Sequence, residues 1–518
     1  MRRVVPLLGF AAALVACSDT LPLEHLAPSA PHLSVAGNAV NRYVIQLSSS
    51  TNAEEFTRAV TSLGGSVVAV HQRAGFAVVE GLTGAGAASL GRQRGVQAIE
   101  PDLVAQVVSP AEQWIGAMPI EGADVGAESQ AKPATAILFG LQWNQRAIGS
   151  PAAWAKGRLG SSSVKVAILD SGIDDTWPDF TARGGTTNPA TALIDKTRSA
   201  SFLPTVGASC LDPSDHELIN GRAATETCPA LAAFFPGKPA WADLNGHGTF
   251  TGGIVSSNGF AFAGVTSQVT LMAVKVLNAR GNGSFSAILQ GVAYATDNGA
   301  DVINMSLGSV FLRHGGYIGF LNGVTRYARS RGVTIVVAAG NDAIDLDHSG
   351  GLYEAFCSSG MVICVSATGE VDEPAFYSNY GTSSVDVAAP GGSYALDKEG
   401  KVILGADGKP VLARIWGGCS RTALDYIPAV PATEETPAKD PGYKKSICTT
   451  GLFTSGAVGT SAASPHVAGL AALLVEGLGR DPGLIRTTLQ ATADDLGKPG
   501  ADPYYGKGRI NVARALGL

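Results

Sequence analysis

Six short apolar runs that alternate with helical patterns, between residue 141 and the C-terminus, constrain the fold of this chain most strongly. Runs of about four to eight residues that are apolar throughout are typical of strands buried on both faces of a sheet. Their alternation with helices indicates parallel pairing through crossover helices. We therefore predict an α/β fold with a doubly wound, mainly parallel sheet flanked by helices. Strands are expected at residues 164–169, 271–277, 302–305, 333–339, 362–365 and 385–388, and helices at 286–295, 317–328 and 463–478.

A smaller unit precedes this region, at residues 42–108. Its pattern runs strand, helix, strand, strand, helix, strand, which matches the split-βαβ plan of ferredoxin-like α+β domains. We expect residues 18–41 to form a flexible tether, residues 109–140 a linker, and residues 141–518 one large domain. In the small unit, strands are expected at residues 43–47, 66–71, 75–80 and 96–107, and helices at 52–63 and 86–92. The large domain is expected to carry two surface insertions, at roughly 181–241 and 392–455.

The first seventeen residues have the pattern of an export signal. Arg2 and Arg3 precede an apolar run over residues 4–16 that is too short to span a bilayer. The run ends in Leu-Val-Ala-Cys, which resembles the lipobox of bacterial lipoproteins, where the cysteine, here Cys17, is lipidated and becomes the new N-terminus. Ordinary signal-peptidase cleavage is the alternative, although Leu14 is bulky for that enzyme. We expect an exported lipoprotein precursor of the cell envelope.

Six further cysteines follow Cys17, an even number in a chain that is expected to be exported. Disulfides are therefore predicted, and six cysteines permit about 15 pairings. A metal site is the weaker interpretation, because no Cys-x-x-Cys pair occurs. Grouping in the sequence makes neighbouring pairs the simplest hypothesis, namely Cys210 with Cys228, Cys357 with Cys364, and Cys419 with Cys448.

The charge and glycine content exclude several classes of protein. The net charge is −6 and only 15% of the residues are charged, which argues against nucleic acid as a partner. No block of like charge occurs, which argues against an intrinsically disordered chain. The 65 glycines indicate many tight turns and close approaches of the backbone.

Two polar residues follow predicted strands, at the end where parallel sheets bind their ligands. Asp170 ends the first run, and Asn341 closes the sequence Val-Val-Ala-Ala-Gly-Asn. In isolation Asp170 is equally well explained as a helix cap or a satisfied buried carboxylate, and Asn341 as a turn residue. The functional interpretation places a carboxylate at the ligand edge of the sheet and an amide that can donate to an oxyanion.

His247 and Ser461 lie in glycine-rich motifs beside apolar helical patterns. Glycines flank His247 in Asn-Gly-His-Gly-Thr and leave space around the imidazole. A lone histidine is more often structural, and His466 beside Pro465 is assigned to that class. Ser461, in Gly-Thr-Ser-Ala-Ala-Ser-Pro-His, precedes a long apolar helix, so it is either an ordinary N-cap or a nucleophile next to backbone N–H groups that suit an oxyanion.

Together these motifs resemble the subtilisin-like serine proteases, the subtilases of peptidase family S8. The order Asp, His, Ser along the chain is that of subtilisin. The resemblance covers about residues 142–518 and implies a catalytic triad of Asp170, His247 and Ser461, with Asn341 and the Ser461 N–H as oxyanion donors. The matching blocks are 170–174, 245–249, 338–341 and 459–469.

Two residues inside these blocks depart from the family pattern. Phe250 stands where a histidine often follows Gly-Thr, and Ala462 stands where methionine commonly follows the nucleophile. Neither departure removes a group that the chemistry requires. An inactive, peptide-binding envelope relative would lack one of these catalytic groups, but none is missing from the sequence. A serine esterase of the α/β-hydrolase kind would carry a Gly-x-Ser-x-Gly elbow, which the sequence does not contain.

The resemblance also implies how substrates bind. Ser306, Leu307 and Gly308 look like the segment, continuing to Ser309, along which an extended protein or peptide substrate pairs. Ala339 and Gly340 are expected in the wall of the pocket for the residue before the cut.

The same resemblance implies that the enzyme is made as a zymogen. Residues 42–108 look like the family's propeptide, an intramolecular inhibitor that is removed by autocleavage near Val108. A lipid on Cys17 would leave with the propeptide, so the mature protease would be extracellular. No cofactor is implied for catalysis. Structural calcium is common in the family, and Asp386 occupies a position that can bind it.

Overall fold

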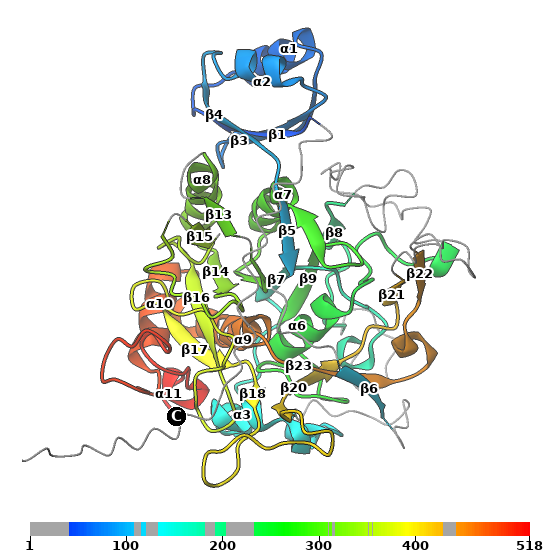
Figure 1. The fold of residues 1–518 in the computed structure, drawn as a ribbon, viewed down its shortest axis with the longest axis vertical. Coiled ribbons are helices and arrows are strands. Elements are labelled where there is room, and N and C mark those ends of the chain that lie inside the picture. Colours follow the sequence, from blue (N-terminus) through cyan, green and yellow to red (C-terminus); the bar gives the residue numbers. More distant parts are fainter. Residues whose placement is uncertain are drawn as a thin grey trace, which may run out of the picture.

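A computed structural model describes most of the chain (Figure 1). The described residues are 41–107, 115–120, 133–181, 192–203, 233–308, 310–312, 316–350, 352–354, 356–427 and 442–518. The predicted export signal with Cys17, the tether and the predicted pair Cys210–Cys228 lie outside them.

A seven-stranded sheet forms the centre of the large domain, with the strand order β17-β16-β14-β11-β7-β9-β8. Every neighbouring pair in it is parallel. The predicted doubly wound α/β fold is therefore confirmed, and all six apolar runs become strands of this sheet. The seventh strand, β8, lies in a range that the sequence had indicated as an insertion. The bounds are β7 Lys165–Asp170, β8 Ala200–Ser201, β9 Thr270–Lys275, β11 Val302–Met305, β14 Thr334–Ala338, β16 Ile363–Thr368 and β17 Val387–Pro390.

Successive residues of each central strand face opposite sides of the sheet and enter two different cores. In β7, Val166 and Ile168 belong to one apolar cluster, and Ala167 and Leu169 belong to the other. This alternation explains why the strands are apolar throughout. Helices α6 (His247–Val255), α9 (Thr460–Leu478) and α10 (Pro482–Ala491) pack on one side, and α7 (Phe285–Asp297) and α8 (Tyr317–Ser330) pack on the other (Figure 1).

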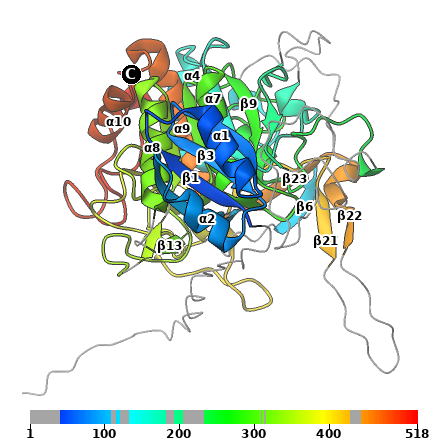
Figure 2. The same cartoon turned by 90° about the horizontal axis from the view of Figure 1, so that it is seen from above.

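The N-terminal unit is a four-stranded antiparallel sheet with two helices on one face, as the split-βαβ pattern predicts. Its open face lies on α7 and α8, whereas α1 and α2 point away from the large domain (Figures 1 and 2). Val44, Phe76 and Val78 of this sheet share an apolar cluster with α7 and α8. The elements are β1 Tyr43–Leu47, α1 Ala53–Ser62, β2 Ser66–His71, β3 Phe76–Glu80, α2 Gly84–Leu90 and β4 Val96–Pro101.

The last predicted strand of this unit, residues 96–107, is wrong as a single strand. It divides into β4, which stays in the N-terminal sheet, and β5 (Val104–Val107), which leaves that sheet. β5 pairs antiparallel with β10 (Asn282–Ser284) and β12 (Leu307–Gly308) of the large domain. The break falls at Asp102, a buried residue whose carboxylate accepts hydrogen bonds from the large domain. Pro101, which cannot donate to a strand ladder, lies beside the break and is the signal in the sequence that the prediction of one strand overlooked.

A second small sheet lies beside α6. It contains β20 (Ile415–Gly418), β23 (Phe453–Ala457) and β6 (Ile115–Pro119), in the order β20-β23-β6. β6 comes from the range expected as a linker, and it pairs antiparallel with β23. Ile120, which follows β6, is buried in the core of the large domain.

Two of the three predicted disulfides lie within the described residues, and both are present. Cys357 is bonded to Cys364, and Cys419 to Cys448. The second bond closes the insertion that carries β21 (Leu424–Ile427) and β22 (Gly442–Lys445).

One helix among the described residues has the length and hydropathy to cross a membrane. It is α9, and 83% of its most apolar window is buried inside the protein, as in a core helix.

Candidate active site

Asp170 and His247 form a buried pair at the carboxyl end of β7. The imidazole Nδ1 lies 2.7 Å from Asp170 Oδ1 and 2.8 Å from Oδ2. Asp170 is 0% exposed and His247 is 1% exposed. A carboxylate at this distance accepts from Nδ1–H, which leaves Nε2 as the basic nitrogen of the ring. The pair therefore has the arrangement of a general base with its orienting acid.

Glycines allow the two loops that carry this pair to touch. Gly172, two residues after Asp170, has φ +107°, a conformation that favours glycine. A Cβ on Gly248, the residue after His247, would lie 2.0 Å from the Gly172 carbonyl oxygen. Gly248 is thus explained by direct contact between the two backbones, and Gly246 on the other side of His247 by its φ of +105°.

Thr251 completes the surroundings of Asp170 and was not recognised from the sequence. Its hydroxyl donates to Asp170 Oδ2 over 3.1 Å. Thr251 lies four residues after His247 on α6, so both side chains occupy one face of the helix. That spacing is a signal from which Thr251 could have been found.

Ser461 lies in the first turn of α9, where backbone N–H groups have no partner within the helix. Four residues later the helix contains Pro465, which has no N–H to donate to the Ser461 carbonyl. Ser306 supplies that donor instead, because its hydroxyl lies 2.8 Å from the Ser461 carbonyl oxygen. The end of β11 and the start of α9 are thereby joined at the candidate nucleophile.

Asn341 contacts the residue before Ser461. Its side-chain oxygen accepts from both the N–H and the hydroxyl of Thr460, each over 2.9 Å. Because Oδ1 faces Thr460, the Nδ2 end of the amide points elsewhere, and it is the end that can donate to an oxyanion. Thr460 also accepts from Gly340 N at 3.1 Å, so it links both candidate residues to α9. Sequence reasoning did not recognise Thr460.

The predicted substrate-binding segment begins next to Ser461, because the Ser306 hydroxyl donates to the Ser461 carbonyl. Leu307 and Gly308 form β12, and Ser306 is the residue before it. Ser309 lies outside the described residues. Ala339 and Gly340 follow β14, and the Ala339 carbonyl accepts from Asn379 Nδ2 over 2.9 Å. This bond holds the expected pocket wall from behind.

His466 is a structural histidine, as its assignment from the sequence proposed. Nδ1 lies 2.8 Å from the Ala462 carbonyl oxygen, and Nε2 lies 2.7 Å from Asn144 Nδ2. These partners suit a neutral ring that donates from Nδ1 and accepts at Nε2. Burial lowers the pKa of His466 to about 4.

Asp243 is a buried carboxylate that sequence reasoning missed. Its oxygens accept from Ser171 Oγ at 2.8 Å and from Thr249 N at 2.8 Å, so it joins the loop after Asp170 to the first turn of α6. It also accepts from Gly246 N over 2.8 Å. Asp243 is 0% exposed, and Lys275, which is also buried, donates to the neighbouring Ala242 carbonyl over 2.6 Å. Burial lowers the pKa of Lys275 to about 8.

The residues around Asp386 do not fit a calcium ion. Its Oδ1 accepts from the Arg486 guanidinium at 2.5 Å and from Gln490 Nε2 at 2.8 Å, and its Oδ2 accepts from Cys364 N at 2.9 Å. A guanidinium on a carboxylate occupies the face that a cation would need. Among the described residues, no group of three or more His, Cys, Asp or Glu side chains could hold a metal ion.

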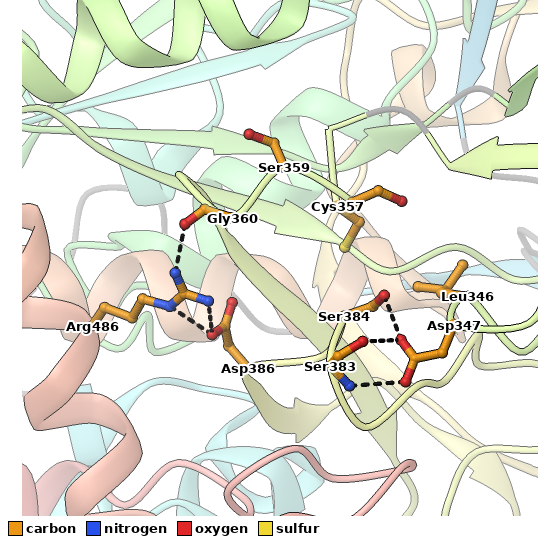
Figure 3. A pocket seen from close by; sticks show the side chains of 10 residues that line it. Leu346, Asp347, Cys357, Ser359, Gly360, Ser383, Ser384, Asp386 and Arg486 are labelled. Carbon is orange, nitrogen blue, oxygen red and sulfur yellow. Dashed lines mark hydrogen bonds and ion pairs between the residues drawn. The ribbon is translucent and has the colours of Figure 1, made fainter. Parts of the chain in front are cut away.

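A cavity of about 310 Å³ lies beside this ion pair, and none of the candidate catalytic or substrate-binding residues that the structure describes lines it (Figure 3). Asp347 on its other side accepts from Ser383 Oγ over 2.7 Å and from Ser384 Oγ over 2.8 Å. Both acidic residues of the cavity are therefore engaged by protein donors.

Comparisons with known proteins agree with this geometry. A profile of the subtilase family matches residues 161–508. Thermitase from Thermoactinomyces vulgaris is 28% identical over 380 residues, which are 72% of this chain and 95% of thermitase. A subtilisin from Bacillus pumilus is 31% identical over 376 residues, 71% of this chain and 96% of that protein. The epidermin leader peptide processing serine protease of Staphylococcus aureus shares the fold, with a TM-score of 0.62 at 20% identity over 92% of this chain and 98% of that one.

Proposed function

The chain belongs to the subtilase family and is a serine endopeptidase, and we propose that it is made as an exported zymogen that cuts itself before it cuts other proteins. Its substrates are proteins or peptides. Residues 42–108 act as an intramolecular inhibitor until the chain is cleaved near Val108.

The proposed mechanism uses the buried pair and the start of α9. His247 Nε2 takes the proton of Ser461 Oγ as the oxygen attacks a peptide carbonyl, and Asp170 stabilises the imidazolium that forms. The oxyanion accepts from the Ser461 N–H and from Asn341 Nδ2. His247 then gives its proton to the leaving amine, and water hydrolyses the acyl-enzyme by the same steps. The 2.7 Å contact between His247 and Asp170 supports these roles.

The observation that carries the zymogen proposal is the position of β5. This segment of the chain lies as an antiparallel strand between β10 and β12, which is how a substrate is expected to bind. Val107 is opposite Leu307, and Gln106 is opposite Gly308. Continued by one residue, this register predicts residue 108 opposite Ser306, which contacts the Ser461 carbonyl. Residue 108 itself lies outside the described residues.

The chain beyond the proposed cut is also held. β6 pairs with β23, and β23 ends three residues before α9 begins. Segments on both sides of residue 108 are thus anchored to strands that flank Ser461. Such an arrangement presents the intervening peptide to the nucleophile in the intact chain.

Two carboxylates of the N-terminal unit support its role as an inhibitor. Glu100 Oε1 accepts from Gly316 N, at the start of α8, over 2.6 Å. Asp102 accepts from the N–H of Ser286, in the first turn of α7, over 2.9 Å, and from its hydroxyl over 2.5 Å. Anionic side chains at helix N-termini stabilise the contact through unpaired N–H groups and the helix dipole. The unit is therefore docked on both sides of the point where β5 enters the cleft.

Expression of the wild type beside Ser461→Ala tests the proposal. We expect the wild type to hydrolyse casein and to remove residues 42–108, and Ser461→Ala to do neither. The variant removes one oxygen from a residue in a buried helix turn, so it is expected to remain folded. An inactive, peptide-binding relative would leave both proteins equally unprocessed, and that outcome would overturn the proposal.

N-terminal sequencing of the mature protein tests the cleavage site. We expect the mature chain to begin just after residue 108. A mature protein that begins upstream of about residue 100 would contradict the proposal, because β5 would then remain in the cleft.

Lipidation of Cys17 is the final part of the proposal. The anchor would lie on the propeptide side of the cut, so maturation would release a soluble protease from the membrane. Labelling with a radioactive fatty acid should mark the full-length precursor and the released propeptide. Label that persists on the fully processed catalytic fragment would contradict release.

A further inference from the structure

A short segment of the insertion closed by Cys419–Cys448 contacts the loop that leads into His247. The hydroxyls of Ser420 and Thr422 donate to the Asp243 carbonyl oxygen over 2.9 Å and 2.7 Å. Leu424 N donates to the Leu244 carbonyl over 2.8 Å. Ser420 is 0% exposed and Thr422 is 1% exposed, so these bonds are shielded from water. The insertion thus holds the main chain three and four residues before His247.

The same segment also contacts the loop after Asp170. Arg421 N donates to Asp174 Oδ2 over 2.8 Å, and the Arg421 guanidinium donates to the Thr176 carbonyl. Asp174 is 1% exposed. A single run of five residues therefore bonds to both loops that carry the Asp170–His247 pair.

Asp243 transmits this contact to the pair itself. Its carbonyl faces the insertion, whereas its carboxylate accepts from Ser171 Oγ and Thr249 N. Ser171 is adjacent to Asp170 in the chain, and Thr249 lies two residues after His247. A shift of Asp243 would therefore displace both members of the pair.

We propose that residues 420–424 are a positioning element for His247, and that the Cys419–Cys448 bond holds this element in place. The proposal rests on the peptidase function proposed above. The segment does not touch substrate, and it acts through Asp243. Misplacement of a general base by about 1 Å can cost up to about a hundredfold in rate. Loss of the positioning bonds should therefore lower kcat and leave KM for a peptide substrate nearly unchanged.

Substitution of the two hydroxyl donors tests the proposal. The full chain carrying Ser420→Ala and Thr422→Val is allowed to mature, and its active sites are counted by titration with a fluorophosphonate. With a peptide p-nitroanilide, we expect kcat per titrated site to fall about tenfold and KM to change by less than about twofold. Thr422→Val and Thr422→Ser are also made singly, and Thr422→Ser, which keeps the hydroxyl, should restore most of the kcat that Thr422→Val loses.

Thr449 provides the matched control. Its hydroxyl donates to the Ser446 carbonyl over 2.8 Å, within the same insertion. Thr449→Val should leave kcat unchanged. An equal loss in Thr449→Val, an unchanged kcat in the Ser420→Ala/Thr422→Val variant, or no rescue by Thr422→Ser would each overturn the proposal.

The two disulfides supply a second measurement if the hydroxyl variant does not fold. Cys419→Ser/Cys448→Ser is compared with Cys357→Ser/Cys364→Ser, whose bond spans only 7 residues. Both pairs should lower thermal stability, but only loss of Cys419–Cys448 should lower kcat at a temperature where both proteins are folded. Equal kcat values in the two variants would reject the positioning role.

The wild type and Ser461→Ala separate failure of this proposal from failure of the peptidase assignment. If the wild type hydrolyses peptide and Ser461→Ala does not, the function stands whatever the insertion variants do.

Discussion

The start of α6 and the second turn of α9 each bury a histidine, and the two differ in what surrounds the ring. His247 faces a carboxylate at 2.7 Å, whereas His466 faces the Ala462 carbonyl and the Asn144 amide. A carboxylate stabilises an imidazolium with a full negative charge, whereas the Ala462 carbonyl beside His466 raises the pKa of that ring by less than burial lowers it. Burial alone therefore does not determine whether a histidine can act as a base, because the charge of the group beside its ring also matters.

Removal of the His247 imidazole, which is paired with Asp170, should have the largest effect on kcat. His247→Gln keeps a polar side chain but has no basic nitrogen, so kcat should fall by about 10⁶, the order seen when a triad histidine is removed. His466→Gln is the matched control and should retain turnover near neutral pH. Initial rates on a peptide p-nitroanilide measure both. Comparable activity in the two variants would remove the distinction between the histidines.

The next effect concerns the group that faces the oxyanion. Asn341→Ala should remain folded and keep most of its substrate binding, yet lose about 10²–10³ in kcat, as for removal of one oxyanion donor. The loss should appear in kcat with KM little changed. A variant with unchanged kcat would show that Asn341 only caps the start of α9 through Thr460.

The neutral histidine predicts an acid-dependent loss of stability. The pKa of His466 is lowered by burial to about 4, below its ordinary value of 6.5. A depressed pKa means that the unfolded chain takes up the proton first, so the stability contribution is complete above pH 6.5 and is lost as pH falls towards 4. This difference between the two pKa values corresponds to a loss of about 3 kcal/mol in the free energy of unfolding as the pH falls.

Denaturant unfolding of the inactive Ser461→Ala protein, measured between pH 7 and pH 4, tests this prediction. The same series with His466→Gln is the control, and it should lack the His466 part of the pH dependence. Parallel curves for the two proteins would show that His466 is not held neutral in the fold.

The smallest effect should follow from the partner of Asp170. Thr251→Val removes a hydroxyl that donates to Asp170 Oδ2 over 3.1 Å. One hydrogen bond to a charged group contributes about 1.5–3 kcal/mol, and because this bond is long we expect the lower end, a fall in kcat of about tenfold. Thr251→Ser should restore activity. A loss as large as that of His247→Gln would mean that Thr251 has a role beyond orienting Asp170.

Much of the fold could be predicted because its signals are local. The six central strands were recognisable from apolar runs, since a strand covered by helices on both faces has no polar side. The candidate site was recognisable from short motifs, because a nucleophile at a helix start and a carboxylate at a strand end need particular neighbours. Two disulfides followed from the proximity of their cysteines in the sequence.

The remainder depended on contacts between distant segments. Pro101 and Asp102, residue types that are depleted in strands, stand at the break within residues 96–107, but they do not indicate that β5 pairs with the large domain. Asp386 has the position of a possible cation ligand in the sequence, but Arg486, 100 residues later, occupies it. The contact of Thr422 with Asp243 spans 179 positions, and no local pattern encodes it.

The sequence by itself determined the fold class, the identity of the candidate triad and the number of cysteines available for bonding. The fold class followed because strand burial and helix patterns are properties of neighbouring residues, and the candidate triad followed from the resemblance of four short motifs to those of the subtilases. Only the tertiary structure decided which histidine faces a carboxylate, that β5 pairs with β10 and β12, and that an insertion donates hydrogen bonds to the loop before His247. These features depend on which surfaces come into contact when the layers pack. Packing joins residues that are far apart in the sequence, and their separation along the chain does not indicate how close they lie in space.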